Sequence, residues 1–242
     1  GLPPKNPVFS GQVLSNYHYF YDLLLAQFSS ITHISPVDLY FRSFPLLVAV
    51  LTGLVAYILA KGWFKSARAA VLSVFFVYFG GSFGWILTFI KDRGIGGETT
   101  FWAQQSISTL INPPFAISLP IFLAGLYLFH RVLEQKDRVL PFIIPLTILW
   151  GTLIEFKAYA GVLVLLSLAV ITLLNLVKRD LAFLKISIPT ALLSVLVFLP
   201  NNLLGGSLLV FSPFWLIHSM IDFPDRLHVM RLSYSRIVNL QT

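Results

Sequence analysis

Residues 139–177 read VLPFIIPLTILWGTLIEFKAYAGVLVLLSLAVITLLNLV, and Glu155 and Lys157 are the only charged residues in this stretch. A single helix of this length would extend about 58 Å, roughly twice the thickness of the hydrocarbon core of a bilayer. The stretch is therefore expected to form two membrane helices that reverse direction near these two residues. Because charge at membrane depth is costly and usually functional, the bend is also a candidate site.

The composition favours a membrane protein over a soluble one. Hydrophobic residues make up 57% of the 242 residues and charged residues 11%, whereas a soluble domain has about 25% charged residues. The net charge of +7 comes mostly from basic residues in short loops between apolar runs, which argues against nucleic acid as a partner. The sequence has no cysteine, which excludes disulfides and thiolate metal sites within it.

The apolar runs predict an all-α, polytopic membrane protein with about six transmembrane helices between residues 44 and 200. The predicted runs are 44–60, 69–90, 113–129, the two halves of 139–177, and 186–200. The run 186–200 and the first half of 139–177 are short, with lengths of about 22–24 Å as helices. Such helices leave water-accessible space at one face of the membrane, where charged groups are tolerated.

Three short connections, at 61–68, 131–138 and 178–185, each contain three Lys or Arg residues. The positive-inside rule places such connections in the cytoplasm. The bend at Glu155 and Lys157 then lies on the non-cytoplasmic side, together with the large loops 1–43, 91–112 and 201–242. Because the chain begins at Gly1 without Met and ends in polar sequence, we expect an internal segment of a longer protein, with residues 1–200 as one transmembrane domain and 201–242 as an incomplete outer region.

The outer segment 1–43 is expected to contain interfacial helices. Aromatic and aliphatic residues recur at helical spacing from Tyr17 to Ile31, with Ser15 as the predicted N-cap. The sequence Ser35-Pro36-Val37-Asp38 has the cap, the proline and the acid of a helix start. The helix that starts there is predicted to continue into 44–60 with a kink at Pro45.

His18 and Asp22 are four residues apart and share one face of the first interfacial helix. One interpretation is a carboxylate base at the membrane surface, with His18 orienting it or binding a phosphate. The other is an ordinary i,i+4 pair on the water-facing side. For the bend, one interpretation is that Lys157 is positioned to bind a phosphate and that Glu155 tunes this lysine. The other is that the turn is exposed at the interface and Lys157 extends its ammonium group to water.

Further candidates lie in the outer loops. Glu98 follows two glycines, in a loop where a carboxylate could bind a divalent cation. Gln104 and Gln105 belong to a polar and aromatic stretch that suits a binding loop or an interfacial belt. Arg226 in the tail could bind a lipid phosphate. Ordinary solvated loop residues are the alternative interpretation for each.

The order of these features resembles the GT-C-type membrane glycosyltransferases. It is similar to the protein mannosyltransferase and aminoarabinose transferase group, and to an uncharacterised membrane family with a Tyr-rich first loop. The resemblance lies in residues 6–22 (NPVFSGQVLSNYHYFYD), the interfacial helix and Ser35-Pro36 that follow, the outer acidic loop, and the short-helix pair with Lys157. It covers about residues 6–200. In that group the main acid follows directly after a first transmembrane helix, so the principal carboxylate could precede Gly1.

Such enzymes transfer a sugar from a polyprenyl-phosphate-linked donor to an acceptor hydroxyl at the outer membrane face. The resemblance implies that Asp22 or Glu98 activates the acceptor or binds a metal, while Lys157 contacts the donor phosphate. His18 and Arg226 are further phosphate candidates, and Glu155, Gln104 and Gln105 are supporting ones. The implied partners are the lipid-linked donor and membrane lipid, in a bacterial or archaeal plasma membrane; the need for a divalent cation stays open.

Two other function classes fit the same sequence. A transporter or flippase-like protein would use Glu155 and Lys157 in a substrate path. A structural membrane subunit would use the outer loops only to bind a partner. The large outer loops and the confinement of charge to the outer half of the helices favour the enzyme, because a transporter would place polar residues nearer the bilayer midplane.

Overall fold

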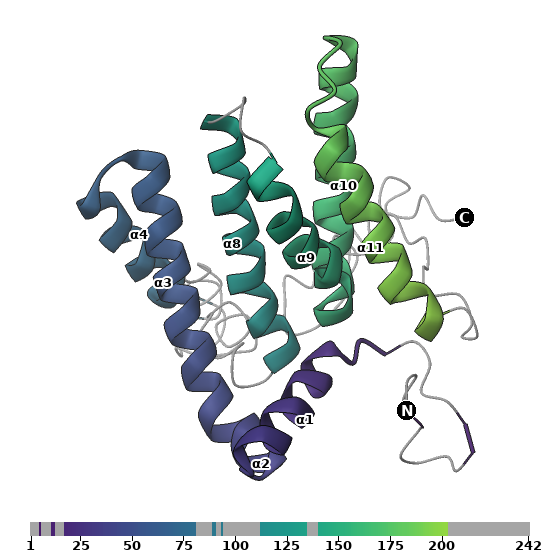
Figure 1. Ribbon diagram of the computed structural model, residues 1–242. Helices are drawn as coiled ribbons and strands as arrows, with labels where there is room; N and C mark the ends of the chain where they lie inside the picture. Colours follow the sequence, from purple (N-terminus) through teal and green to yellow (C-terminus); the bar gives the residue numbers. More distant parts are fainter. Residues whose placement is uncertain are drawn as a thin grey trace. The chain divides into compact units, whose positions relative to one another are not determined.

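The computed structural model describes Lys5, Gly11, Gln12 and residues 17–80, 89–90, 93, 112–134 and 140–202. Every secondary-structure element within these residues is helical, which confirms the predicted all-α class. The chain divides into two compact units, and all of the labelled helices in Figure 1 belong to the first, which comprises residues 1–80 and 105–205.

Helices lie in all of the predicted apolar runs. Their bounds are α3 Phe44–Phe64, α4 Ala67–Phe79, α8 Pro113–Glu134, α9 Leu140–Phe156, α10 Ala158–Val177 and α11 Leu184–Asn202. In the described part of the chain, three helices are long and apolar enough to cross a membrane: Pro36–Phe64, which includes α3, then α8 and α10. Helices α4, α9 and α11 are apolar but shorter. The three long helices indicate an integral membrane protein.

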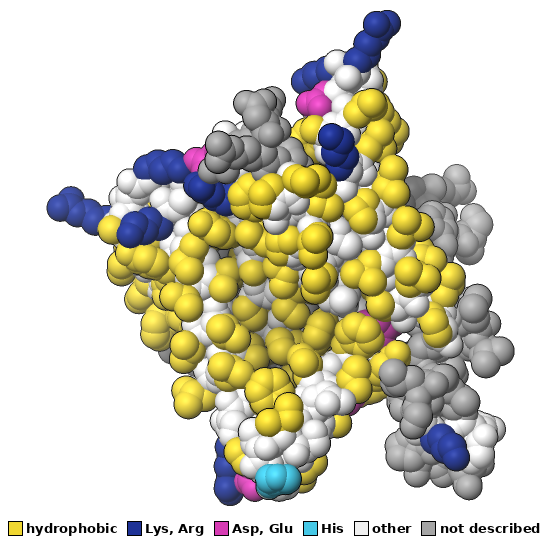
Figure 2. Space-filling model, viewed as in Figure 1, with side chains coloured by type: hydrophobic (Ala, Val, Ile, Leu, Met, Phe, Trp, Pro, Cys, Tyr) yellow, Lys and Arg dark blue, Asp and Glu magenta, His cyan; other side chains and the backbone are white. Residues whose placement is uncertain are grey.

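The basic connections of the first unit gather at one end of the helices. Lys65 in the α3–α4 turn forms a 2.5 Å salt bridge with Glu134 at the end of α8. Phe129 of α8 packs against Phe183 in the α10–α11 turn, with ring centroids 5.8 Å apart. Figure 2 shows Lys and Arg side chains around these turns and hydrophobic side chains over the middle of the helices. The junction of α9 and α10 lies at the opposite end (Figure 1).

Two apolar clusters form the core of the first unit. The larger one lies among α8, α9, α10 and α11 and centres on Leu146, Leu153 and Trp150. The second, which we call the N-terminal cluster, lies at the end away from the basic turns. Its buried members are Tyr21, Leu25, Leu39, Phe44, Val48, Ala116, Ile117 and Phe156.

The N-terminal cluster is built on the segment that precedes α3. Helix α1 spans Phe20–Thr32, and its N-cap is Tyr19, which makes no side-chain cap bond. Because residues 17–19 are not helical, the prediction that this helix begins after a cap at Ser15 is wrong. Helix α2 spans Pro36–Asp38, and the Ser35 hydroxyl accepts a 3.3 Å hydrogen bond from the Val37 N–H. The predicted cap at Ser35 is therefore confirmed.

A π-helix, η1, spans Leu39–Ser43 between α2 and α3. The Phe44 N–H donates to the carbonyl of Leu39, five residues earlier. Pro45, the next residue, has no N–H to donate, and its ring would collide with the carbonyl four residues before it in a regular helix. The wider π turn relieves that collision, so the kink predicted at Pro45 takes the form of η1 within one continuous helix, Pro36–Phe64.

Glycine at position 161 permits the close approach of α9 and α10. A Cβ at Gly161 would lie 2.5 Å from the backbone Cα of Ile154, whereas a Cβ at Gly62 in α3 would lie 3.5 Å from the nearest ring atom of Tyr127. We expect Gly161→Ala to destabilise the protein by about 1–3 kcal/mol, because backbone cannot yield as a side chain can. Thermal unfolding in detergent, followed by circular dichroism, measures the change.

The matched control is Gly62→Ala. This change adds a methyl group at ordinary contact distance and replaces glycine within a helix, so we expect it to be neutral or to stabilise by up to about 1 kcal/mol. Equal unfolding midpoints for the two variants would show that the α9–α10 contact is not a constraint.

Candidate functional site

The reversal between α9 and α10 is made by a single residue outside both helices. Lys157 has extended backbone angles (φ −155°, ψ 108°) between Phe156, the last residue of α9, and Ala158, the first of α10. Its N–H donates to the Leu153 carbonyl at 2.9 Å, and its carbonyl accepts from the Ala160 N–H at 3.0 Å. The backbone is thus hydrogen-bonded through the turn, and the bend predicted at residues 155–157 is confirmed.

Glu155 lies inside the protein next to this turn. Its relative exposure is 0%, and neither carboxylate oxygen has a hydrogen-bond partner among the described residues. The backbone N–H of Tyr19 faces the carboxylate without completing a hydrogen bond of good geometry. A buried carboxylate without a partner is costly, so a structural role alone does not account for this residue.

Lys157 is half-buried at the tip of the turn. Its ammonium nitrogen lies 5.3 Å from the centroid of the Tyr159 ring, within the range of a cation–π contact. Among the residues that the structure describes, it forms no salt bridge. The ammonium group can therefore bind an anion.

Residues 17–19, directly before α1, connect three charged side chains. The Tyr17 hydroxyl hydrogen-bonds to the Asp22 carboxylate, His18 lies within the electrostatic range of Lys157 and Asp22, and Tyr19 lies within that of Glu155. The next residue, Phe20, packs edge-to-face on Phe156 at the end of α9, with centroids 5.9 Å apart. This aromatic contact holds residues 17–19 against the α9–α10 turn.

The pKa values of this segment follow from burial and from these neighbours. Burial, and then the hydrogen bond to Asp22 and its charge, raise the pKa of Tyr17 to about 12. Burial and the charge of Glu155 raise the pKa of Tyr19. Burial and the Lys157 ammonium lower the pKa of His18 below its usual 6.5, against the opposing effect of Asp22. His18 is therefore mainly neutral at pH 7 and serves as a hydrogen-bonding group, with Lys157 as the cation.

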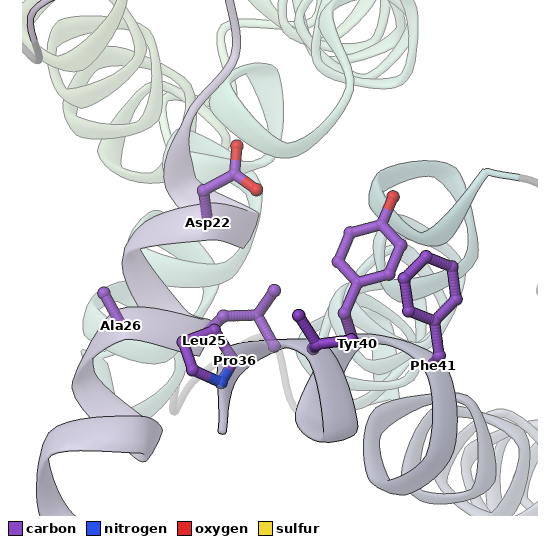
Figure 3. A pocket seen from close by; sticks show the side chains of 7 residues that line it. Asp22, Leu25, Ala26, Pro36, Tyr40 and Phe41 are labelled. Atoms are coloured by element: carbon purple, nitrogen blue, oxygen red, sulfur yellow. The ribbon is translucent and has the colours of Figure 1, made fainter. Parts of the chain in front are cut away.

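An open groove of about 470 Å³ lies between α1 and the α2–η1 segment, and Asp22 stands at its edge. In Figure 3 the Asp22 carboxylate and the Tyr40 hydroxyl come from two neighbouring helical segments and point toward the same side of the view. The lining residues are Asp22, Leu25, Ala26, Pro36, Val37, Tyr40 and Phe41.

The predicted site residues that fall in the described chain lie in one region. Residues 17–19 and the α9–α10 turn bring together His18, Asp22, Glu155 and Lys157. The other predicted site residues lie outside the described residues: Glu98, Gln104, Gln105 and Arg226. No group of three or more potential metal-ligating side chains occurs within the described part.

Sequence reasoning missed the tyrosines of this site. Tyr17 was assigned to an apolar helix face, and Tyr19 and Tyr40 were not singled out. The run Tyr17-His18-Tyr19 carried a signal, because three consecutive side chains that combine a ring with a polar tip suit the border between an apolar cluster and charged groups.

Comparison with protein-family models, with curated proteins and with solved structures gave no match. Function is therefore inferred from the chemistry of the site itself. That chemistry comprises a half-buried carboxylate, a cation without a salt-bridge partner among the described residues, and an imidazole within the electrostatic range of both.

The link between His18 and its two charged neighbours can be measured directly. In Lys157→Ala we expect the pKa of His18 to rise, because the ammonium that disfavours the imidazolium is removed. In Asp22→Asn we expect it to fall, because the carboxylate that favours the imidazolium is removed. NMR titration of histidine-labelled protein measures both shifts, with His18→Gln to assign the signal. A His18 pKa that is the same in all backgrounds would contradict the described geometry.

Proposed function

We propose that this chain is part of a GT-C-like membrane glycosyltransferase that moves a sugar from a polyprenyl-phosphate-linked donor to an acceptor hydroxyl. The observation that supports the proposal is the packing of residues 17–19 on the α9–α10 turn. It brings the carboxylate of Asp22 and the ammonium of Lys157 to the same end of the helices, both within the electrostatic range of His18. A base for the acceptor and a cation for the phosphate are what this reaction needs.

In the proposed reaction, Asp22 accepts the proton of the acceptor hydroxyl as its oxygen attacks the anomeric carbon of the sugar. A new bond forms between that oxygen and the anomeric carbon, and the bond from this carbon to the phosphate oxygen breaks. Polyprenyl phosphate leaves with the electron pair, and Lys157 stabilises its negative charge. Neutral His18 orients the carboxylate or donates a hydrogen bond to the phosphate.

The proposed topology has six membrane helices: α3, α4, α8, α9, α10 and α11. The basic turns at one end face the cytoplasm by the positive-inside rule, so the α9–α10 turn and α1 lie at the non-cytoplasmic face. Helix α9 has 17 residues and spans about 26 Å. Because it is shorter than the hydrocarbon core, its end at Glu155 and Lys157 lies in a depression that water and a lipid headgroup can reach.

The position of the charges favours an enzyme over a transporter. Glu155 is the last residue but one of α9, and Lys157 follows the helix, so both lie at one end of the helices. A transport path would require such groups near the bilayer midplane, at the interface of two related halves. The proposed enzyme needs them only where the headgroup of a lipid donor lies.

The first test is the pair of variants Asp22→Asn and Lys157→Ala in membranes of cells that express the full-length protein. We expect each to lower the transfer of radiolabelled sugar from a polyprenyl-phosphate donor by about 10²–10⁴-fold, because one loses the base and the other the phosphate cation. The product is measured as label that leaves the donor-lipid fraction.

Two control variants are matched in residue type. Asp38→Asn removes a carboxylate that pairs on the surface with Arg42 at 2.9 Å, and Lys61→Ala removes an ammonium that lies 5.7 Å from the Tyr57 ring in α3. Both should leave transfer near the unmodified rate, because exposed pairs contribute little. Undiminished transfer in both Asp22→Asn and Lys157→Ala would refute the site.

The topology is tested by labelling single cysteines, since the chain contains none of its own. A membrane-impermeant maleimide added to intact cells should label His33→Cys, at the C-cap of α1, and should leave Arg179→Cys, in the α10–α11 turn, unlabelled until the membrane is opened. The reverse pattern would invert the orientation and place the site in the cytoplasm.

A further inference from the structure

Asp22 belongs to two groups of residues. Its charge acts on His18, which also lies within the electrostatic range of Lys157. It also lines the groove between α1 and the α2–η1 segment, and among the described lining residues it alone is charged. The carboxylate is thus shared by a mainly apolar groove (Figure 3) and by the charged groups around His18.

The groove is unsuited to the phosphate of the donor. None of the lining side chains that the structure describes is cationic, and the Asp22 carboxylate would repel an anion. Leu25, Ala26, Pro36 and Val37 present apolar surface instead, and the carboxylate can accept a hydrogen bond from a hydroxyl or an ammonium group. Charge and polarity therefore select a ligand with an apolar body and a head that is not anionic.

The groove is bordered by exposed apolar side chains. Val37 and Phe41 on its rim are 64% and 65% exposed, and Ile31 at the end of α1 is 75% exposed. Such a surface is stable where α1 and α2 lie at a membrane interface, with their apolar side chains among lipid chains. A ligand would then enter from the lipid, and not from bulk water.

The shape of the groove depends on η1. Tyr40 and Phe41 are consecutive residues of the π turn imposed before Pro45, and both line the groove. Single π turns occur frequently at functional sites because they turn side chains out of the regular helical register. The π turn therefore supplies two of the side chains that line the groove.

We propose that this groove binds the acceptor, and that the acceptor is a membrane amphiphile with a hydroxyl-bearing head that carries no negative charge. Its apolar body lies on Leu25, Pro36 and Val37, and its hydroxyl reaches Asp22. The assignment rests on the proposed transferase function. The donor headgroup then occupies the opposite side of the same carboxylate, at His18 and Lys157.

The test uses photolabelling of the full-length protein in phosphatidylcholine vesicles without any donor. The probe is a diacylglycerol with a diazirine in one acyl chain, and the comparison probe is phosphatidic acid with the same chain. We expect the neutral probe to label the segment 22–41. We expect the anionic probe to label it about tenfold less, because the Asp22 carboxylate repels the phosphate of phosphatidic acid. Asp22→Asn should reduce the difference in labelling between the two probes.

Substitution at adjacent positions of α1 distinguishes the groove from the surrounding surface. Ala26 lines the groove, whereas exposed Gln27 does not. Ala26→Trp should lower labelling by the neutral probe about tenfold because the indole fills the space, and Gln27→Trp should leave it unchanged. Equal labelling of the two variants by the neutral probe would overturn the proposal. Equal labelling of the segment 22–41 of the unmodified protein by the two probes would also overturn it.

The result is separable from the test of the transferase. If sugar transfer is normal in Ala26→Trp, the acceptor binds elsewhere, and the groove assignment fails while the transferase proposal stands. If labelling follows the expected pattern but the protein transfers no sugar from any lipid-linked donor, the transferase proposal fails and the role of the groove as acceptor site fails with it. Loss of both labelling and transfer in Ala26→Trp, with both intact in Gln27→Trp, supports the proposal.

Discussion

The reversal of the chain at Lys157 is the constraint on which the site depends. In hydrocarbon every backbone N–H and C=O needs a partner within the protein, and a turn with one non-helical residue nearly satisfies this requirement through the bonds of Lys157 to Leu153 and Gly161. Such a tight turn forces α9 and α10 together, which is why a glycine faces the backbone of Ile154. The same geometry directs Glu155 inward and leaves Lys157 at the tip.

Aromatic packing then determines which groups meet this turn. Phe20 contacts Phe156, and Tyr21 is buried against Phe44 with ring centroids 5.9 Å apart. Each such pair contributes only about 0.5–1.5 kcal/mol beyond its buried area. Several of them together fix the entry of α1, and with it the positions of residues 17–19. The charged groups are thus brought together by apolar contacts, because no salt bridge joins them in the part of the chain that the structure describes.

The sequence predicted the parts of this arrangement that depend on local rules. Ser35-Pro36 began a helix as expected because a cap and a proline act within one turn, and the position of the bend followed from helix length against bilayer thickness. The start of α1 was misplaced because the cap rule was applied to Ser15, whereas tertiary contact of Phe20 with α9 decides where the helix begins. The meeting of residues 17–19 with residues 155–157 could not be predicted, since it joins segments more than a hundred residues apart.

The buried carboxylate of Glu155 is the feature that stability alone does not explain. An apolar side chain of similar volume at this position would remove the desolvation cost and leave the packing of Leu153 and Phe156 unchanged. The carboxylate faces the Tyr19 backbone and lies two residues before the ammonium of Lys157. In the proposed enzyme this carboxylate lies inside the protein behind the turn, while the turn itself presents the Lys157 ammonium to the donor phosphate.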